Sequence, residues 1–218
     1  NSLFEMVDKE NIQLFKRKSH IFSQGDEPNE LYYIKNGKVK VSKVNSEGKE
    51  FSISILSEKS FLGHQALIEN QKYSESAVSL EDTEIVSIPK EKFLRLLSNN
   101  RRVSIEFLKI LNSQNKLNEK RLFSMAFDSV RKRTASALFD LCEKYKGPIK
   151  SSEIIINISR DDLASIVGTA TETVIRCLSE FKDEGIIRVQ GRKIYVSSLE
   201  KLKKLCYIVL FLQVQSVV

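Results

Sequence analysis

The chain has 218 residues, of which 41% are hydrophobic and 29% charged, and its formal net charge is +7. This balance is typical of a soluble globular protein and excludes intrinsic disorder, because there are enough large apolar residues to form a core. The three cysteines, Cys142, Cys177 and Cys206, are few and widely spaced, which argues against a disulfide scaffold and favours a cytoplasmic protein. The longest apolar stretch, Leu205 to Leu212, is too short to span a bilayer, so we expect no membrane partner.

From about Ser19 to Pro89 the sequence has the alternating pattern of half-buried strands. Leu31 to Ile34 is followed by Asn36-Gly37, a strong two-residue hairpin signal, and Ser46-Glu47-Gly48 predicts a second turn. Two later strand-like segments flank Glu81-Asp82. Many short strands at even spacing predict an antiparallel roll, barrel or sandwich.

A short helix is predicted from Lys90, and a long helix runs without Gly or Pro from about Arg101 to Phe127. Apolar side chains lie on two faces of the long helix, so it needs two partners. We expect one face to cover the strands and the other, with a seven-residue spacing, to meet the same helix in a second chain; the alternative is a helix buried within one domain. The expected dimer seam consists of Val103, Phe107, Ile110, Gln114 and Leu117.

The most informative segment runs from Ser159 to Phe181 and predicts two helices joined at Gly168. Ser159 is a suitable helix cap, and Gly168 permits the left-handed backbone of a sharp turn. The buried face of the second helix is expected to hold Val174, Cys177, Leu178 and Phe181. Its opposite face presents Thr171, Glu172, Ile175, Arg176 and Ser179. This is the pattern of a helix-turn-helix whose second helix enters the major groove of DNA.

A basic hairpin is predicted directly after these helices. Apolar residues alternate from Gly185 to Val196 around a Gln190-Gly191 turn, as in a two-stranded wing. The wing is basic, which suits contacts with phosphate groups. Its basic residues are Arg188, Arg192 and Lys193.

The exposed face of the second helix has side chains that could read base pairs. Arg176 could donate two hydrogen bonds to guanine, and Glu172 could accept one from cytosine. Ile175 could touch a thymine methyl group, and Thr171 would tune the sequence preference. An ordinary surface ion pair between Glu172 and Arg176, four residues apart, is the alternative.

The charge distribution agrees with a DNA-binding C-terminal part. From Ser129 onward there are 15 Lys+Arg and 10 Asp+Glu, a net of +5, which leaves 7 − 5 = +2 for residues 1–128. We expect an α+β protein with three parts: a β-roll over residues 1–100, a dimerisation helix over 101–128, and a winged helix-turn-helix with an apolar tail over 129–218.

Nearly the whole chain resembles the Crp/Fnr family, the bacterial regulators related to the cyclic-AMP receptor protein and the fumarate-and-nitrate-reduction regulator. The resemblance rests on Gly25 to Val41, on Phe61-Leu62-Gly63, on Ala77 to Glu84 and on Glu172 to Arg176. It implies a cyclic-nucleotide-binding-like β-roll of the jelly-roll type, a homodimer, an inverted-repeat DNA site and a contact with RNA polymerase. It further implies phosphate contacts by Arg160, Thr173 and Arg192.

The sequence departs from the family at the effector site. Cyclic-nucleotide binders carry a Gly-Glu pair that holds the ribose and an Arg, followed by Ser or Thr, that neutralises the phosphate. The corresponding positions here look like Gly63-His64 and Tyr73-Ser74. Tyrosine supplies no permanent positive charge, so we expect no physiological cyclic-AMP binding. The residues that the resemblance places at an effector pocket are Gly63, His64, Gln65, Ala66, Tyr73, Ser74, Asn118 and Glu119.

Cofactors are constrained by residue type. Residues 1–141 contain no cysteine, which excludes the N-terminal iron–sulfur cluster of some family members. Haem, with His64 or His20 as axial ligand, and an unidentified small-molecule effector stay open; we predict no cofactor and no metal site. The expected function is a transcription regulator and not an enzyme, since the sequence has no phosphate loop and no clustered metal ligands. The alternative is a ligand-sensing or protein-interaction module whose winged helix does not read DNA.

Overall fold

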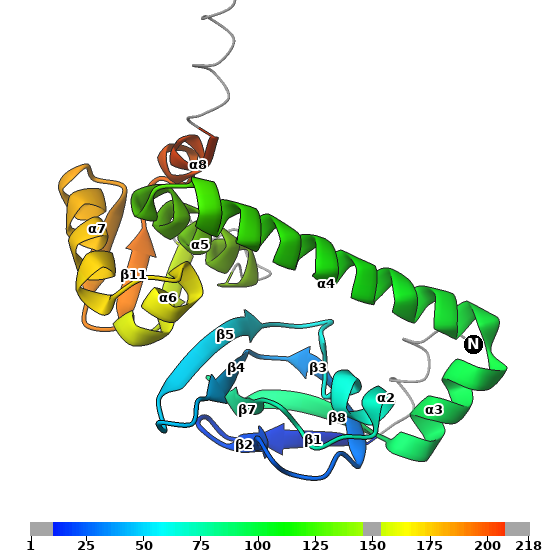
Figure 1. The fold of residues 1–218 in the computed structure, drawn as a ribbon. Coiled ribbons are helices and arrows are strands. Elements are labelled where there is room, and N and C mark those ends of the chain that lie inside the picture. The colour runs from blue at the N-terminus through cyan, green and yellow to red at the C-terminus, as the bar shows by residue number, and fades with distance from the viewer. Residues whose placement is uncertain (1–10, 146–153, 208–218) are drawn as a thin grey trace, which may run out of the picture. The chain divides into compact units, whose positions relative to one another are not determined.

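The computed structural model describes residues 11–145 and 154–207. The chain divides by its internal contacts into two compact units, residues 1–120 and 121–218. The division falls inside the long helix α4 (Arg101–Phe127), which Figure 1 shows as one continuous helix. Each unit is described by itself.

The first unit is a β-roll built from two antiparallel four-stranded sheets, with strand orders β1-β8-β3-β6 and β2-β7-β4-β5. Both sheets contribute apolar side chains to the interior, as the predicted alternation requires. The strands are β1 (Ile12–Phe15), β2 (His20–Phe22), β3 (Glu30–Asn36), β4 (Val39–Val44), β5 (Glu50–Leu56), β6 (Phe61–Leu62), β7 (Ser76–Ser79) and β8 (Thr83–Pro89).

The Asn36-Gly37 turn does not form the predicted hairpin. β3 pairs with β6 and β8, whereas β4 pairs with β5 and β7, so the turn carries the chain from one sheet to the other. Gly37 has φ +100°, and a Cβ there would lie 2.6 Å from the hydroxyl of Thr83, so no larger residue fits. The predicted turn at Ser46-Glu47-Gly48 does join two paired strands, β4 and β5.

Two short helices and the start of α4 complete the core of the roll. These are α2 (His64–Glu69) and α3 (Lys90–Asn99), and Asn100 caps α4 by accepting hydrogen bonds from the backbone of residues 102 and 103. The ring of Phe107 lies edge-on to Phe61 and Phe93. The first turns of α4 are therefore part of the core of the roll.

This packing corrects the predicted dimer seam. Val103 and Phe107 are 1% and 2% exposed within the core of the roll, so they cannot line a surface that meets a second chain. Ile110 is partly buried against the same cluster, and Gln114 is half-buried. Leu117, the last residue of the seam, is exposed. The apolar spacing identified a buried face but not the partner that covers it.

The opposite face of α4 is the more exposed one. Leu108 and Leu122, two heptads apart, are 61% and 68% exposed. Phe123 and Phe127 follow near the end of the helix, with their ring centroids 4.7 Å apart, and both are also exposed. In the described part of the chain, this face has no covering element.

The second unit is a winged helix-turn-helix with a small three-stranded sheet of order β10-β11-β9. Helix α5 packs against α6, α7 and α8. The core includes Leu138, Leu163, Phe181 and Ile194, which are fully buried. The elements are α5 (Val130–Tyr145), β9 (Ile154–Asn157), α6 (Arg160–Val167), α7 (Thr171–Asp183), β10 (Ile187–Gln190), β11 (Lys193–Val196) and α8 (Leu199–Tyr207).

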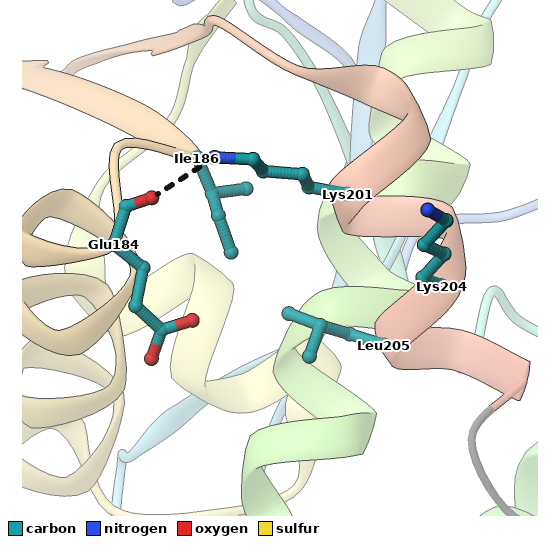
Figure 2. Close-up of a pocket in the computed structure, with 5 residues that line it drawn as sticks. All are labelled: Glu184, Ile186, Lys201, Lys204 and Leu205. Carbon is teal, nitrogen blue, oxygen red and sulfur yellow. Dashed lines mark hydrogen bonds between the residues drawn. The ribbon is translucent and has the colours of Figure 1, made fainter.

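Helix α8 was not expected from the sequence. Its buried Leu202 joins the core, and the apolar stretch from Leu205 continues beyond the described residues. A hollow of about 370 Å³ lies beside α8, where the Lys201 ammonium donates a hydrogen bond to the Glu184 carbonyl at 3.5 Å (Figure 2). Of the helices in the described ranges, none combines the length and the hydropathy needed to cross a bilayer.

Candidate nucleic-acid interface

The first helix of the helix-turn-helix begins at its predicted cap. The Ser159 hydroxyl accepts a hydrogen bond from the backbone N–H of Asp162 at 3.0 Å. Asp161 and Asp162 lie in the first turn, where the helix dipole favours negative charge. The helix buries Leu163, Ala164 and Val167.

The turn between the two helices is held from outside. Gly168 has φ +72°, and its N–H bonds the carbonyls of residues 164 and 165. Arg133 of α5 donates to the Gly168 carbonyl at 3.3 Å and to the Met125 carbonyl at 2.9 Å. One guanidinium therefore joins the end of α4 to the turn that precedes α7.

Helix α7 has the two faces that the sequence predicts. It buries Val174, Cys177, Leu178 and Phe181. Glu172, Ile175 and Arg176 are exposed on the other face, and Ile175 is 47% exposed despite its apolar side chain. An apolar side chain between two charged ones suits the major groove of DNA, where thymine methyl groups lie next to the hydrogen-bonding edges of the bases.

Two threonines of α7 are less exposed than these three residues. Thr171 is half-buried, and its hydroxyl donates a hydrogen bond to the Asp161 carboxylate at 2.9 Å. The bond ties the first residue of α7 to the first turn of α6, which fixes the angle at which α7 starts. Thr173 is also half-buried, and its N–H bonds the carbonyl of Ala170.

The other end of α7 is fixed by an arginine that sequence reasoning did not identify. Arg131 of α5 donates to the carboxylates of Glu180 and Glu184 at 2.7 and 2.6 Å. Its guanidinium also lies over the ring of Phe181, 4.8 Å from the centroid. The pKa of Arg131 is raised by these two carboxylates against the opposing effect of desolvation. No spacing along the sequence could reveal this contact, because it joins residues about fifty positions apart.

The wing forms as predicted around Gln190-Gly191, with Gln190 paired to Lys193. Arg188, Arg192 and Lys193 are all exposed on this ribbon. The Arg188 guanidinium lies over the ring of Tyr195, 5.0 Å from its centroid. The ribbon that follows α7 in the chain therefore exposes three cations.

Arg160, a predicted phosphate contact, is placed differently from the wing cations. Its guanidinium donates to the Gly191 carbonyl at 2.8 Å and to the Ile158 carbonyl at 3.5 Å. Partial burial lowers the pKa of Arg160. The structure thus brings Arg160 together with the turn of the wing.

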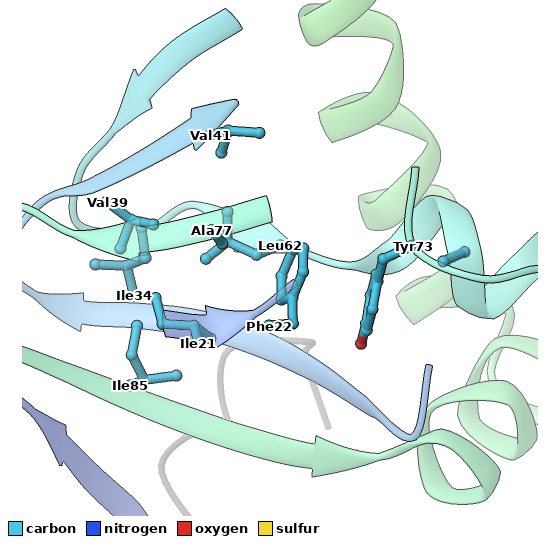
Figure 3. Packing of buried hydrophobic residues seen from close by; sticks show 10 residues of the cluster. Ile21, Phe22, Ile34, Val39, Val41, Leu62, Tyr73, Ala77 and Ile85 are labelled. Atoms are coloured by element: carbon cyan, nitrogen blue, oxygen red, sulfur yellow. The ribbon is translucent and has the colours of Figure 1, made fainter. Parts of the chain in front are cut away.

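In the roll, Tyr73 lies beside Phe22 in a cluster of buried apolar side chains (Figure 3). Tyr73 stacks on Phe22 with ring centroids 4.0 Å apart, and Phe22 stacks in turn on Tyr32. The Tyr73 hydroxyl donates a hydrogen bond to the Glu30 carbonyl at 3.2 Å, and burial raises the pKa of Tyr73 to about 12. A Cβ at Gly63 would lie 3.1 Å from the same ring, which ties this glycine to Tyr73.

His64 begins α2 next to this group. Its ring lies edge-on to Phe107 at 5.7 Å, and burial lowers its pKa. Among the described residues, its Nδ1 atom has no hydrogen-bond partner. Ala66 is buried in the same region.

The other residues predicted for the effector pocket are exposed. Gln65 bonds the carboxylate of Glu69, and Ser74 lies at the surface. Asn118 and Glu119 are exposed on α4, and no hydrogen bond among the described residues joins either of them to Tyr73 or His64. The structure therefore places Gly63 against the Tyr73 ring, with Ala66 in the same buried cluster as Tyr73, and leaves Gln65, Ser74, Asn118 and Glu119 exposed. Within the described ranges, no three His, Cys, Asp or Glu side chains form a cluster that could hold a metal ion.

Both units match known family models. A cyclic nucleotide-binding domain model matches residues 12–100, and a Crp-like helix-turn-helix domain model matches residues 132–205. The chain is 28% identical over 195 residues to the cyclic AMP receptor protein of Thermus thermophilus, covering 89% of this chain and 88% of that protein. This chain belongs to the CRP/FNR family of transcription regulators.

Other CRP/FNR regulators are similar over most of their length. The anaerobic regulatory protein of Bacillus subtilis is 27% identical over 193 residues, covering 87% of this chain and 81% of that one. A solved CRP/FNR-family regulator from Thermus thermophilus has a TM-score of 0.74 at 25% identity and covers 90% of this chain and 98% of the other. The CRP/FNR family comprises transcription regulators with a helix-turn-helix DNA-binding domain, not enzymes.

Proposed function

We propose that this protein is a sequence-specific regulator that binds an inverted-repeat DNA site as a homodimer, without control by cyclic AMP. The observation that carries the proposal is the exposed face of α7, with Glu172, Ile175 and Arg176, together with a wing that exposes three cations. In this role the protein would act in the cytoplasm and contact RNA polymerase.

The side chains of α7 supply the chemistry for reading bases. Arg176 donates two parallel hydrogen bonds to O6 and N7 of guanine, and Glu172 accepts one from N4 of cytosine. Ile175 packs against a thymine methyl group. Thr171 tunes the preference, with its hydroxyl already bonded to Asp161.

Phosphate contacts position α7 in the groove. Arg188, Arg192 and Lys193 on the wing and Thr173 on α7 are suited to bind phosphate oxygens. Such contacts release counterions, so the logarithm of the binding constant falls linearly with the logarithm of the salt concentration.

The homodimer is supported by the uncovered apolar face of α4. Leu108 and Leu122 repeat at heptad spacing, as in helices that pair with a second copy. Two copies of α7 related by a two-fold axis would read half-sites about one helical turn apart.

Independence from cyclic AMP is supported by Tyr73 and His64. A buried cyclic phosphate needs a cation, and the neutral Tyr73 ring, with a pKa of about 12, supplies none. Lys72 is directed elsewhere, to an ion pair with Glu27 at 3.5 Å. We assign no cofactor to this protein.

The first test is selection of genomic DNA fragments by the purified protein with no ligand added. We expect recovery of an inverted repeat, and no heat of cyclic-AMP binding by titration calorimetry. Weak, salt-sensitive binding without a sequence motif would instead favour a module whose winged helix serves protein contacts.

The base-reading role is tested by Arg176→Ala on the selected site. The expected loss is about 1–3 kcal/mol on the cognate duplex, with little change on a scrambled duplex. Lys182→Ala, an exposed charge removed from the last turn of the same helix, is the control. Equal losses for Arg176→Ala on both duplexes would contradict base reading.

A further inference from the structure

The geometry points to Arg160 as the residue that positions the wing for DNA, acting through Gly191 and not through a phosphate of its own. This inference rests on the proposed DNA binding and assigns to Arg160 a role different from the phosphate contact that family resemblance implies.

The start of α6 holds two consecutive carbonyls of the wing turn. The Arg160 Nη2 atom donates to the Gly191 carbonyl at 2.8 Å, and the backbone N–H of Ile158 donates to the Arg192 carbonyl at 3.3 Å. Ser159, the residue between these two donors, is the cap of α6. The tip of the wing is thereby fastened to the capped start of the helix-turn-helix.

The turn needs such a fastening. Gly191 has φ +56°, and a Cβ there would meet no atom within 4 Å, so side-chain packing does not restrain it. Glycine has more backbone freedom than any other residue, so hydrogen bonds to this turn restrict a backbone that side-chain packing leaves free. The bond from Arg160 supplies one directly to its carbonyl.

The Arg160 guanidinium is directed at protein rather than at solvent. It is half-buried and also donates to the Ile158 carbonyl at 3.5 Å, so two of its donors face backbone carbonyls. By contrast, Arg192 and Lys193 are exposed, and among the described residues neither has an ion-pair partner. The wing cations are therefore the groups available to phosphate, and Arg160 fixes the turn from which they extend.

The test is a mutant cycle on DNA binding by the full chain. The variants are Arg160→Ala, the pair Arg192→Ala/Lys193→Ala, and all three together, with Lys182→Ala as the control for loss of one surface charge. Fluorescence anisotropy gives the slope of log K against log salt on the selected duplex, in which each phosphate contact counts for about 0.9. Thermal melting confirms that each variant is folded.

With two wings in the DNA-bound homodimer, a positioning role predicts that Arg160→Ala lowers the slope as much as the wing pair does, by about 3.6, and adds nothing in the combined variant. A direct phosphate contact, one in each protomer, predicts a loss of about 1.8 from Arg160→Ala in both backgrounds, which would overturn the inference. Arg160→Lys keeps the charge but not the two-carbonyl fork, so it also lowers the slope; a slope like that of the wild type would contradict positioning.

Amide hydrogen exchange on the DNA-free protein separates this inference from the proposed function. In Arg160→Ala, we expect faster exchange at Ile158 and in the wing, and unchanged exchange in α7. Unchanged exchange in the wing would overturn positioning even if DNA binding is intact. If the wild type binds no duplex, the proposed function fails; if the wing pair has no effect on binding, the phosphate role of the wing fails. In either case the exchange data still decide whether Arg160 holds the wing.

Discussion

Tyr73 shows how one side chain can stabilise the roll in two ways. It combines a stack on Phe22 with a hydrogen bond from its hydroxyl to Glu30, and the two contributions can be separated by substitution. We expect Tyr73→Phe to lower the free energy of unfolding by about 1 kcal/mol, since only the hydrogen bond is lost. Tyr73→Ala also leaves a cavity and should cost about 3 kcal/mol or more. Urea unfolding of both variants measures the difference, and equal costs would show that the stack contributes nothing.

His64 gives a pH dependence of defined sign. Burial lowers its pKa in the folded protein from 6.5, so at pH values just below 6.5 the unfolded chain binds more protons than the folded one. The free energy of unfolding should therefore fall as the pH drops from about 7 through this range, and His64→Gln should remove that part of the fall.

The measurement is urea unfolding across pH 5 to 8 for the wild type and His64→Gln, with NMR titration of the ring. Replacement of the other histidine, His20→Gln, assigns the NMR signals. Parallel stability curves for wild type and His64→Gln would contradict the prediction.

At the scale of elements, the turn of the helix-turn-helix depends on a left-handed residue. Gly168→Ala places a Cβ at φ +72° and 3.0 Å from the end of the flexible Met125 side chain, which can move. The expected cost is about 1–2 kcal/mol of backbone strain. Gly185→Ala, at φ +67° with open space around it, is the matched control and should cost the same. A much larger loss at Gly168 in thermal melting would show that Met125 is held rigidly.

Local features of the second unit could be predicted from the sequence, because they depend on neighbouring residues. The cap at Ser159, the turn at Gly168 and the wing follow from residue type and spacing. Contacts between distant parts of the chain could not be predicted. Asn36-Gly37 predicts a turn, but it does not predict which sheets the turn connects. In the same way, the spacing around Val103 predicts an apolar helix face but not which element packs against it. The hydrogen bond from Arg160 to the wing joins residues that only the fold brings together, so the sequence could not predict it.

At the scale of the whole molecule, the corrected faces of α4 make a prediction about assembly. Leu108→Glu with Leu122→Glu places charges on the uncovered apolar face and should give a monomer of 25.0 kDa by sedimentation equilibrium. Val103→Ala, a change inside the roll, should lower stability by about 2 kcal/mol and leave the oligomer intact. A dimer that survives the double substitution would show that another surface joins the chains.

The guanidinium of Arg133 has a practical consequence for dissecting the protein. A fragment cut at Ser129 would lose the Met125 carbonyl that Arg133 binds and the bond from Arg121 to the Ile166 carbonyl at 3.4 Å. A fragment that starts at Arg121 keeps both. A stable DNA-binding fragment of this chain should therefore include the last two turns of the long helix. The fragment that starts at Ser129 should melt at a lower temperature, although it contains every residue of the helix-turn-helix match.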